Sequence, residues 1–252
     1  MSLPFLQPYL GLSNSLQTTA SGGASWDWED DFSYADQTAF DAKWAYINAI
    51  TRGNPSTDAI DYSILRDGIN ASISYDLQQA GGLGSNLSDT AWVYRNLIQV
   101  TTRTSSNLNV VNLFGARSVS SSTAGDVNSS QDSLTIEGFV AGVGVQAYFM
   151  LPCNNNRETS SASVYTFTTA SPTVGSLYLQ TIRLSATTWS AQFFSNATYT
   201  TSVEASGSQT CSSGITSLRY IGITDTLQDS YTGQLAGTYN VPKIVNGVTT
   251  PP

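Results

Sequence analysis

The chain has 252 residues, enough for one large domain or two small ones, and a formal net charge of −8 from 18 acidic and 10 basic residues. Nucleic acid and anionic membranes are poor partners for such a chain, because neutralising phosphate needs clustered lysine and arginine, and the two lysines, Lys43 and Lys243, lie far apart in sequence. Histidine does not occur, which excludes Ser-His-Asp and Cys-His catalysis and most zinc and copper sites, and leaves paired carboxylates or hard cations bound through oxygen.

The composition also indicates an unusual surface. Charged residues make up 11% of the chain, whereas serine and threonine together supply 66 residues. The surface must therefore be built mainly from hydroxyls and amides, which suits an extracellular or virion exterior. No run of eighteen apolar residues occurs, so no membrane insertion is expected. The first residues lack a basic stretch and carry Pro4 and Pro8, so the sequence does not predict a signal peptide there.

Residues 1–24 read as an extended arm and linker. The segment ends in Thr-Thr-Ala-Ser-Gly-Gly-Ala, a flexible linker composition. Its apolar anchors include Leu3, Phe5, Leu6, Tyr9 and Leu10. One interpretation is a frayed terminus or an extra edge strand. The other is an assembly arm that docks onto a neighbouring subunit, which would make the protein a homo-oligomer or attach it to other virion or surface proteins.

Residues 26–44 are rich in tryptophan and carboxylates. Ser33 and Asp36 have the spacing of a capping box, which predicts a short helix near residues 36–44. Phe40 and Trp44 would then share one helical face. We expect these two rings to close one end of the core.

From residue 58 onward the sequence reads as strand after strand. Ile73, Tyr75 and Leu77 alternate with polar residues, the period-two pattern of a half-buried strand. In Thr90–Val100 the pattern predicts Trp92, Tyr94, Asn96 and Ile98 on one face and Val93, Arg95 and Leu97 on the other. Both faces hold apolar residues, so this strand is expected to be central.

Further expected strands are separated by glycine, serine and asparagine clusters. They are Asn109–Ala116, Ser133–Ala141, Val143–Leu151, Ser163–Thr169, Ser176–Ser185, Trp189–Ser195, Ile215–Thr224 and Leu235–Val245. No linker interrupts them, and no window beyond the short helix shows strong helical periodicity. This pattern predicts one all-β sandwich or jelly roll over residues 25–252.

The two cysteines, Cys153 and Cys211, lie in polar, loop-like stretches. Unpaired cysteines are usually buried and have apolar neighbours. We therefore expect a disulfide between them, worth roughly 4 kcal/mol on the chain-entropy model. Two unpaired thiols are the alternative.

The order of these features resembles the concanavalin A-like lectin/glucanase superfamily, in the form of β-sandwich modules found in viral, phage and archaeal surface proteins. The segments that carry the resemblance are Asp30–Tyr34, Ala39–Trp44, Ile73–Leu77, Ser88–Arg95, Ile215–Ile221 and Gly233–Tyr239. The resemblance implies a concanavalin A-like jelly roll of two antiparallel sheets with one short helix near the N-terminus. It implies little about function, since one fold hosts many functions.

The glucanases of that superfamily resemble one another in a strand that carries Glu-X-Asp-X-X-Glu. This sequence does not contain that pattern. The four glutamates are Glu29, Glu137, Glu158 and Glu204. The best-placed one, Glu137, has no evident partner for a retaining pair about 5–5.5 Å apart. We therefore expect no enzyme activity and no catalytic residue.

No cofactor is expected, although calcium is compatible with the acidic run. Related sandwiches often bring the first and last strands together, where oxygen ligands could meet. The candidate ligands are Asp27, Glu29, Asp30, Asp31 and Asn240. Asn240 stands where many relatives look to have aspartate, and the run could equally be a solvated loop.

Aromatic side chains could stack on sugar rings. Trp92, Phe40 and Trp44 are expected in the core. The candidates for a glycan-binding face are Trp26, Trp28, Tyr148 and Tyr178.

These observations favour a non-enzymatic virion surface or structural protein, such as a capsid decoration, spike or tail-fibre subunit, with a lectin-like sandwich that binds host glycans. The alternative is a secreted or cell-surface carbohydrate-binding module. A glycoside hydrolase is the weakest interpretation. The expected location is the virion surface or the extracellular space.

Overall fold

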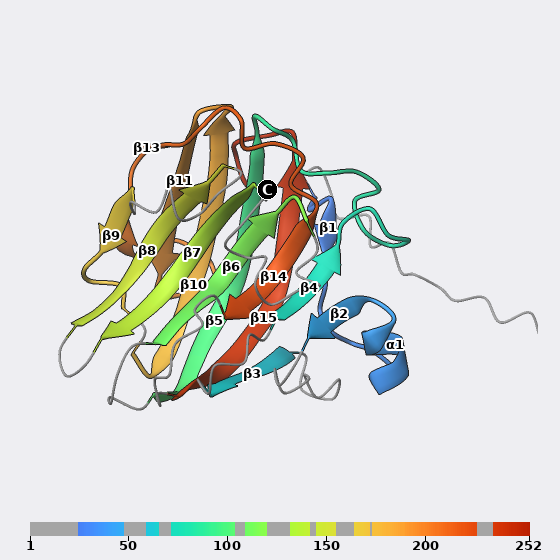
Figure 1. Ribbon diagram of the computed structural model, residues 1–252, viewed down its shortest axis with the longest axis horizontal. Helices are drawn as coiled ribbons and strands as arrows, with labels where there is room; N and C mark the ends of the chain where they lie inside the picture. Colours follow the sequence, from blue (N-terminus) through green and yellow to red (C-terminus); the bar gives the residue numbers. More distant parts are fainter. Residues whose placement is uncertain are drawn as a thin grey trace, which may run out of the picture.

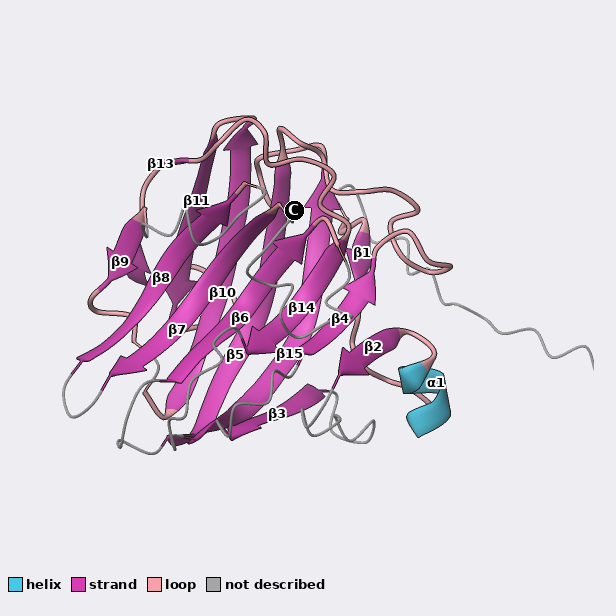
Figure 2. Ribbon diagram, in the orientation of Figure 1, coloured by secondary structure: helices cyan, strands magenta, loops and turns pink. Residues whose placement is uncertain are grey.

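Two antiparallel sheets pack face to face and enclose the core (Figure 1). The computed structural model describes residues 25–47, 59–65, 72–103, 109–119, 132–141, 145–154, 164–171, 173–225 and 234–252. The assembly arm, including Leu3, Phe5, Leu6, Tyr9 and Leu10, lies outside the described residues. Strands dominate the described part, and one short helix lies beside the sheets (Figure 2). The all-β sandwich predicted from the sequence is thereby confirmed.

Sheet A has eight strands in the described part of the chain, in the order β1-β15-β5-β10-β11-β12, with β3 paired to β15 and β13 paired to β11. Their bounds are β1 (Trp28–Glu29), β3 (Ala59–Leu65), β5 (Trp92–Arg103), β10 (Gly175–Ser185), β11 (Thr188–Phe194), β12 (Ser202–Ala205), β13 (Gln209–Thr210) and β15 (Gln234–Asn246).

Sheet B has seven strands across the same described ranges, in the order β2-β4-β14-β6-β7-β8-β9. Their bounds are β2 (Trp44–Ile47), β4 (Ser72–Asp76), β6 (Asn109–Arg117), β7 (Ser133–Ala141), β8 (Val145–Cys153), β9 (Tyr165–Phe167) and β14 (Tyr220–Asp225). β7 has the bounds expected from the sequence. The short strands β2, β12 and β13 had no matching expectation, because two to four residues are too few to show a period.

β5 lies between β15 and β10, so the prediction of a central strand is confirmed. Trp92, Tyr94 and Ile98 point into the core and are fully or almost fully buried. Arg95 and Leu97 point outward and are half-buried. The alternation of side chains along one strand thus supplies core on one face and surface on the other.

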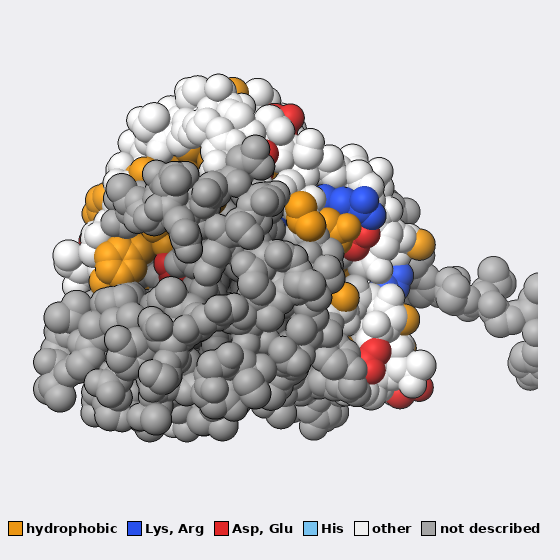
Figure 3. All heavy atoms as spheres, in the orientation of Figure 1, with side chains coloured by type: hydrophobic (Ala, Val, Ile, Leu, Met, Phe, Trp, Pro, Cys, Tyr) orange, Lys and Arg blue, Asp and Glu red, His pale blue; other side chains and the backbone are white. Residues whose placement is uncertain are grey.

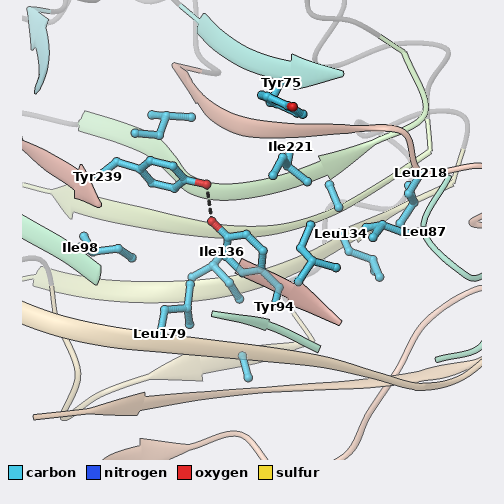
Figure 4. Packing of buried hydrophobic residues seen from close by; sticks show 14 of the residues in the cluster. Tyr75, Leu87, Tyr94, Ile98, Leu134, Ile136, Leu179, Leu218, Ile221 and Tyr239 are labelled. Carbon is cyan, nitrogen blue, oxygen red and sulfur yellow. Dashed lines mark hydrogen bonds between the residues drawn. The ribbon is translucent and has the colours of Figure 1, made fainter. Parts of the chain in front are cut away.

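The core is rich in aromatic rings and contains a polar pair at its centre. The hydroxyls of Tyr94 and Tyr239, both fully buried, hydrogen-bond to each other (Figure 4). Ile98 and Leu179 from sheet A and Ile136 and Ile221 from sheet B surround this pair. Burying each such aliphatic side chain stabilises the fold by about 1.5–3 kcal/mol.

Charged side chains lie mostly at one edge of the face seen in Figure 3, toward the side where α1, β2 and β4 lie in Figure 1. The ion pair between Arg219 and Asp76, with nitrogen and oxygen 2.6 Å apart, involves β4. Most of the described charged side chains visible on this face thus lie near one margin (Figure 3).

The helix α1 (Gln37–Asp41) is shorter than predicted, and its cap is a different residue. Asp36 is the N-cap, and its carboxylate accepts a hydrogen bond from the Ala39 amide at 2.9 Å. Ser33 instead donates its hydroxyl to Asp31. Trp44 begins β2 rather than ending the helix, yet its ring lies parallel to that of Phe40 at 6.4 Å between centroids. Both rings are buried, as expected.

The predicted disulfide is not formed in this structure. Cys153 and Cys211 both carry thiols and are buried at 3% and 6% exposure. Cys153 ends β8 in the interior, and burial raises the pKa of the Cys211 thiol. The polar, loop-like sequence around each cysteine was thus a misleading indication of a disulfide. Their flanking residues nevertheless meet, since the Asn154 amide donates to the Ser212 hydroxyl at 2.7 Å.

Asp30 connects the end of the first strand to the turn that follows it and to β2 of sheet B. It is 8% exposed, and its carboxylate accepts hydrogen bonds from the Phe32 amide at 2.8 Å, from the Trp44 indole at 2.8 Å and from the Tyr34 hydroxyl. Burial, together with this bond to Asp30, raises the pKa of Tyr34. The Asp30 carboxylate thereby holds two donors from the segment after β1 and one donor from the first residue of β2.

We expect Asp30→Ala to lower the free energy of unfolding by about 3 kcal/mol, because it leaves three donors without their acceptor. Chemical denaturation monitored by tryptophan fluorescence measures the loss. Asp31→Ala is the matched control. Asp31 is exposed and, among the described residues, accepts hydrogen bonds from the Ser33 amide and hydroxyl, so its loss should cost less than about 1 kcal/mol. Equal losses in the two variants would contradict the structural role of Asp30.

Glu204 joins the two sheets at the opposite edge. Its carboxylate, on β12, accepts hydrogen bonds from the backbone amides of Thr168, Thr169 and Ala170 at 2.7–3.1 Å. These amides follow β9 of sheet B. Burial opposes ionisation of Glu204, but the three amide bonds outweigh it and lower the pKa.

A lowered pKa in the folded state means that Glu204 stabilises the protein above pH 4.5, its ordinary pKa, and that this contribution disappears as the pH falls through the lower folded value. We expect Glu204→Gln to cost about 1 kcal/mol at pH 7, because water partly screens the site. The difference from the unmodified protein should shrink below pH 4.5. Urea unfolding between pH 7 and pH 3.5 checks this, with the exposed Glu29→Gln as control. A difference that does not change with pH would contradict it.

Candidate functional site

The outward side of sheet A carries aligned rows of polar and aromatic side chains. Lys243 of β15, Arg95 of β5, Gln180 of β10 and Gln192 of β11 are register partners in that order across four strands. The next row runs from Leu97 through Tyr178 to Phe194. We call this surface the sheet-A face; it consists of these seven residues together with Trp26, Tyr199 and the groove described next.

A groove of about 210 Å³ lies on the sheet-A face over β10, β11 and β12. Its described lining residues are Gln180, Ile182, Leu184, Ser190, Ala191, Gln192, Ala205, Gly207 and Ser208. Amides and hydroxyls alternate there with aliphatic side chains, and none of these lining residues carries a charge. Such a surface can donate and accept hydrogen bonds while it contacts apolar C–H groups.

The two glutamines are oriented by the protein but not saturated by it. Gln180 Oε1 accepts from Arg95 Nε at 2.7 Å, and Gln192 Nε2 donates to the Ser202 hydroxyl at 2.9 Å. Within the described ranges, Gln180 Nε2 and Gln192 Oε1 have no hydrogen-bond partner. The groove therefore presents one amide donor and one amide acceptor in fixed positions.

Rings and cations meet beside the groove. The guanidinium carbon of Arg95 lies 4.1 Å from the Tyr199 ring centroid and 5.5 Å from that of Trp26. Lys243 Nζ lies 5.4 Å from the Trp26 ring centroid. Tyr199 also makes edge contacts with Tyr178 at 5.7 Å. These cation–π contacts fix the rings and the cations relative to one another.

The loop that carries Tyr199 is braced by Asn196. The Asn196 amide nitrogen donates to the Thr198 and Thr200 hydroxyls, each at 2.8 Å, and its carbonyl oxygen accepts from the backbone amides of Thr200 and Thr201 at 3.0–3.1 Å. Tyr199 itself has φ +54°, a left-handed conformation that is unfavourable for a bulky residue. The hydroxyl of Tyr199 donates to the Asn96 carbonyl of β5 at 3.3 Å. The loop is thus locked against the sheet.

Of the four aromatic residues expected to bind glycan, two lie on the sheet-A face. Trp26 and Tyr178 are half-buried there. Trp28 and Tyr148 are instead core residues, 5% and 1% exposed, so the expectation was wrong for them. Strand alternation turns both inward, where Trp28 packs on Tyr75 at 4.7 Å and Tyr148 stacks on Phe193 at 4.6 Å.

The acidic run does not converge on one point. Asp30 is used inside the turn, Asp31 accepts from Ser33, and Asp27 accepts from the Asn246 amide at 2.7 Å. Asn240 lies farther along β15, where it donates to the Thr238 hydroxyl. Among the described residues, no group of three or more histidine, cysteine, aspartate or glutamate side chains could hold a metal ion. Calcium binding by Asp27, Glu29, Asp30, Asp31 and Asn240 stays a prediction.

A second pocket lies next to this run, with a volume of about 170 Å³. Its lining residues are Trp28, Glu29, Asp30, Asp31, Ser33, Tyr34, Lys43, Tyr75 and Gly81. Several of its polar atoms already have partners in the protein: Asp30 and Asp31 as above, and Lys43, whose ammonium donates to the Ala80 carbonyl. The sheet-A groove is larger and lies beside the cation–π contacts of Arg95 with Trp26 and Tyr199, so it is the better candidate site.

Gln180, Gln192 and Tyr199 were not recognised from the sequence. The period-two pattern did place Arg95 on the outward face of its strand. The same pattern in Ser176–Ser185 puts Tyr178 and Gln180 on one side, but only the register between β10 and β11 brings Gln192 beside them. Tyr199 lies in a loop, where no period exists.

Comparison with known proteins identifies the fold. No protein-family model matches the sequence, and no curated protein matches it. Peanut lectin, solved with a nine-residue peptide, is similar in structure, with a TM-score of 0.54 and 10% sequence identity over 87% of this chain and 97% of that chain. The carbohydrate recognition domain of Emp47p gives 0.51 and 8% over 89% and 97%. Lectin II from Ulex europaeus gives 0.50 and 9% over 87% and 99%.

These proteins share the concanavalin A-like sandwich, which is therefore the fold of this chain. In the part of the chain that the structure describes, no helix is long and apolar enough to cross a membrane.

Proposed function

We propose that this protein binds glycans through the sheet-A face and does not turn them over. The observation that carries the proposal is the groove lined by amides, hydroxyls and aliphatic side chains beside Trp26, Tyr178 and Tyr199. A sugar presents hydroxyls that both donate and accept, and C–H faces that pack on aromatic rings. The groove offers the complement of each. The lectin-like fold adds support, because two of the similar structures are lectins by name and a third is a carbohydrate recognition domain.

The absence of catalysis is part of the same proposal. Most glycoside hydrolases use two carboxyl groups that flank the scissile bond. The described residues that line the groove carry none. Glu204, on the neighbouring strand, is committed to three backbone amides. The groove is thus suited to holding a saccharide rather than cleaving it.

Gln192→Leu tests the groove. It keeps the volume of the side chain but removes the amide, and we expect about tenfold weaker binding to a glycan first identified on an array, which corresponds to the loss of one or two hydrogen bonds. Isothermal titration calorimetry measures the change. Gln78→Leu makes the same chemical change at an exposed turn after β4 and is expected to have no effect. Mass spectrometry of the bound glycan should find it intact.

Two results would contradict the proposal. The first is an array with no ligand at millimolar affinity for the unmodified protein. The second is equal weakening by Gln192→Leu and Gln78→Leu. Cleavage or loss of a substituent from the glycan would contradict only the non-enzymatic part.

We propose further that the protein is a surface subunit of a virus particle, with the sandwich facing solvent. The support is compositional: 11% charged residues and a quarter serine and threonine give an exterior of hydroxyls and amides. A secreted or cell-surface carbohydrate-binding module is the alternative.

Deletion of residues 1–24 tests the assembly proposal. If these residues dock onto a neighbouring subunit, the deletion variant should be monomeric by light scattering and should not enter particles, whereas the full chain should be oligomeric. The melting temperature of the variant should stay close to that of the full chain, which controls for misfolding. A variant that has the same oligomeric mass and still enters particles would exclude the arm as the assembly element.

A further inference from the structure

The sheet-A face contains two neighbouring cations in a protein of net charge −8. Lys243 and Arg95 are register partners on adjacent strands. Arg219, in contrast, pairs with Asp76. Lys243 and Arg95 contact aromatic rings and an amide instead of a carboxylate. Among the described residues, neither cation forms an ion pair, although Glu29 is the register partner of Lys243 on β1. Two adjacent cations of this kind are an electrostatic feature that a neutral ligand would not need.

We infer that the glycan bound on this face is an acidic saccharide, whose carboxylate or sulfate is held by Arg95 and Lys243; this inference rests on the glycan-binding function proposed above. The geometry of Arg95 is the first argument. Its Nε donates to Gln180, and its guanidinium lies over the rings of Tyr199 and Trp26, with the guanidinium carbon 4.1 Å and 5.5 Å from their centroids. The two terminal nitrogens of Arg95 have no hydrogen-bond partner among the described residues. A guanidinium fixed in this way binds an oxyanion with two parallel hydrogen bonds.

The surroundings give the second argument. Arg95 is half-buried, and burial lowers its pKa, since the charge is partly removed from water. A partly desolvated cation interacts more strongly with an anion than an exposed one does. The neighbouring residues in its row toward the groove, Gln180 and Gln192, are neutral, so nothing on that side competes for the charge.

Glu29 sets the orientation of the ligand. It is exposed and lies across from Lys243 on β1, on the side away from the groove. Its carboxylate repels the anionic group of the saccharide from that end of the row. The anionic group is therefore held closest to Arg95, while the rest of the saccharide extends over Gln180 and Gln192 into the groove.

The experiment compares one saccharide with and without its charge. Oligogalacturonate and its methyl ester share a sugar backbone but differ in the carboxylate, and sulfated and unsulfated dextran oligosaccharides provide the same contrast for sulfate. We expect the full-length protein to bind one of the acidic forms at least tenfold more tightly than its neutral partner, as one charged hydrogen-bonded contact would give. Added salt should reduce this preference.

Single substitutions identify the residues that cause the preference for the acidic saccharide. Arg95→Gln should bring the acidic and neutral forms to within about twofold of each other while binding of the neutral form persists, and Arg95→Lys should keep part of the preference. Lys243→Gln should reduce the preference for the acidic form severalfold. If circular dichroism shows that Arg95→Gln does not fold, Lys243→Gln provides the test instead. Gln78→Leu should leave the preference unchanged.

Equal binding of acidic and neutral forms would overturn the inference but leave the proposed function standing. A preference that survives Arg95→Gln and Lys243→Gln would also overturn it, because the anion would then bind elsewhere. If no form in either pair binds and the array is also empty, the proposed function fails together with the inference.

Discussion

The strict alternation of side chains along β5 is the constraint on which both the core and the candidate site depend. Hydrogen bonds to β15 on one side and β10 on the other prevent this strand from rotating or slipping. Tyr94 must then face the core, where its hydroxyl meets that of Tyr239, and Arg95 must face outward. A slip of one residue would bury Arg95 between the sheets and expose Tyr94. The position of the cation on the surface is thus guaranteed by the same contacts that build the interior.

Asp30 has a comparable role at the margin of the sandwich. A buried carboxylate without partners would be strongly destabilising, but here three donors surround it. The result is that the segment after β1 and the first residue of β2, at the edge of sheet B, are joined around a single side chain. The carboxylates of Asp27, Asp30 and Asp31 thus stabilise this segment through hydrogen bonds within the protein.

The sequence was sufficient to predict what depends on neighbouring residues. The period-two pattern identified most of the longer strands, the central position of β5 and the burial of Trp92, and the four-residue spacing of Phe40 and Trp44 indicated that these rings lie together in the core. It failed where partners are distant in sequence. Trp28 was a candidate for the glycan-binding face, but its pairing with Ile244 turns it inward. The groove needs the register of three strands, and the state of the two cysteines depends on how their loops meet. None of these three features can be predicted from a local sequence pattern.

The loop braced by Asn196 has a consequence for the energetics of recognition. A flexible loop that closed over a saccharide would lose its conformational freedom at the moment of binding, and this loss would weaken the affinity. Here Asn196 holds four groups of the loop, and the unfavourable backbone of Tyr199 is stabilised by its contacts with Arg95 and β5. The loop therefore loses its conformational freedom when the chain folds, and not when a ligand binds. A ligand arriving at the ring of Tyr199 meets a surface that is already rigid, so that even a few weak contacts suffice to hold it.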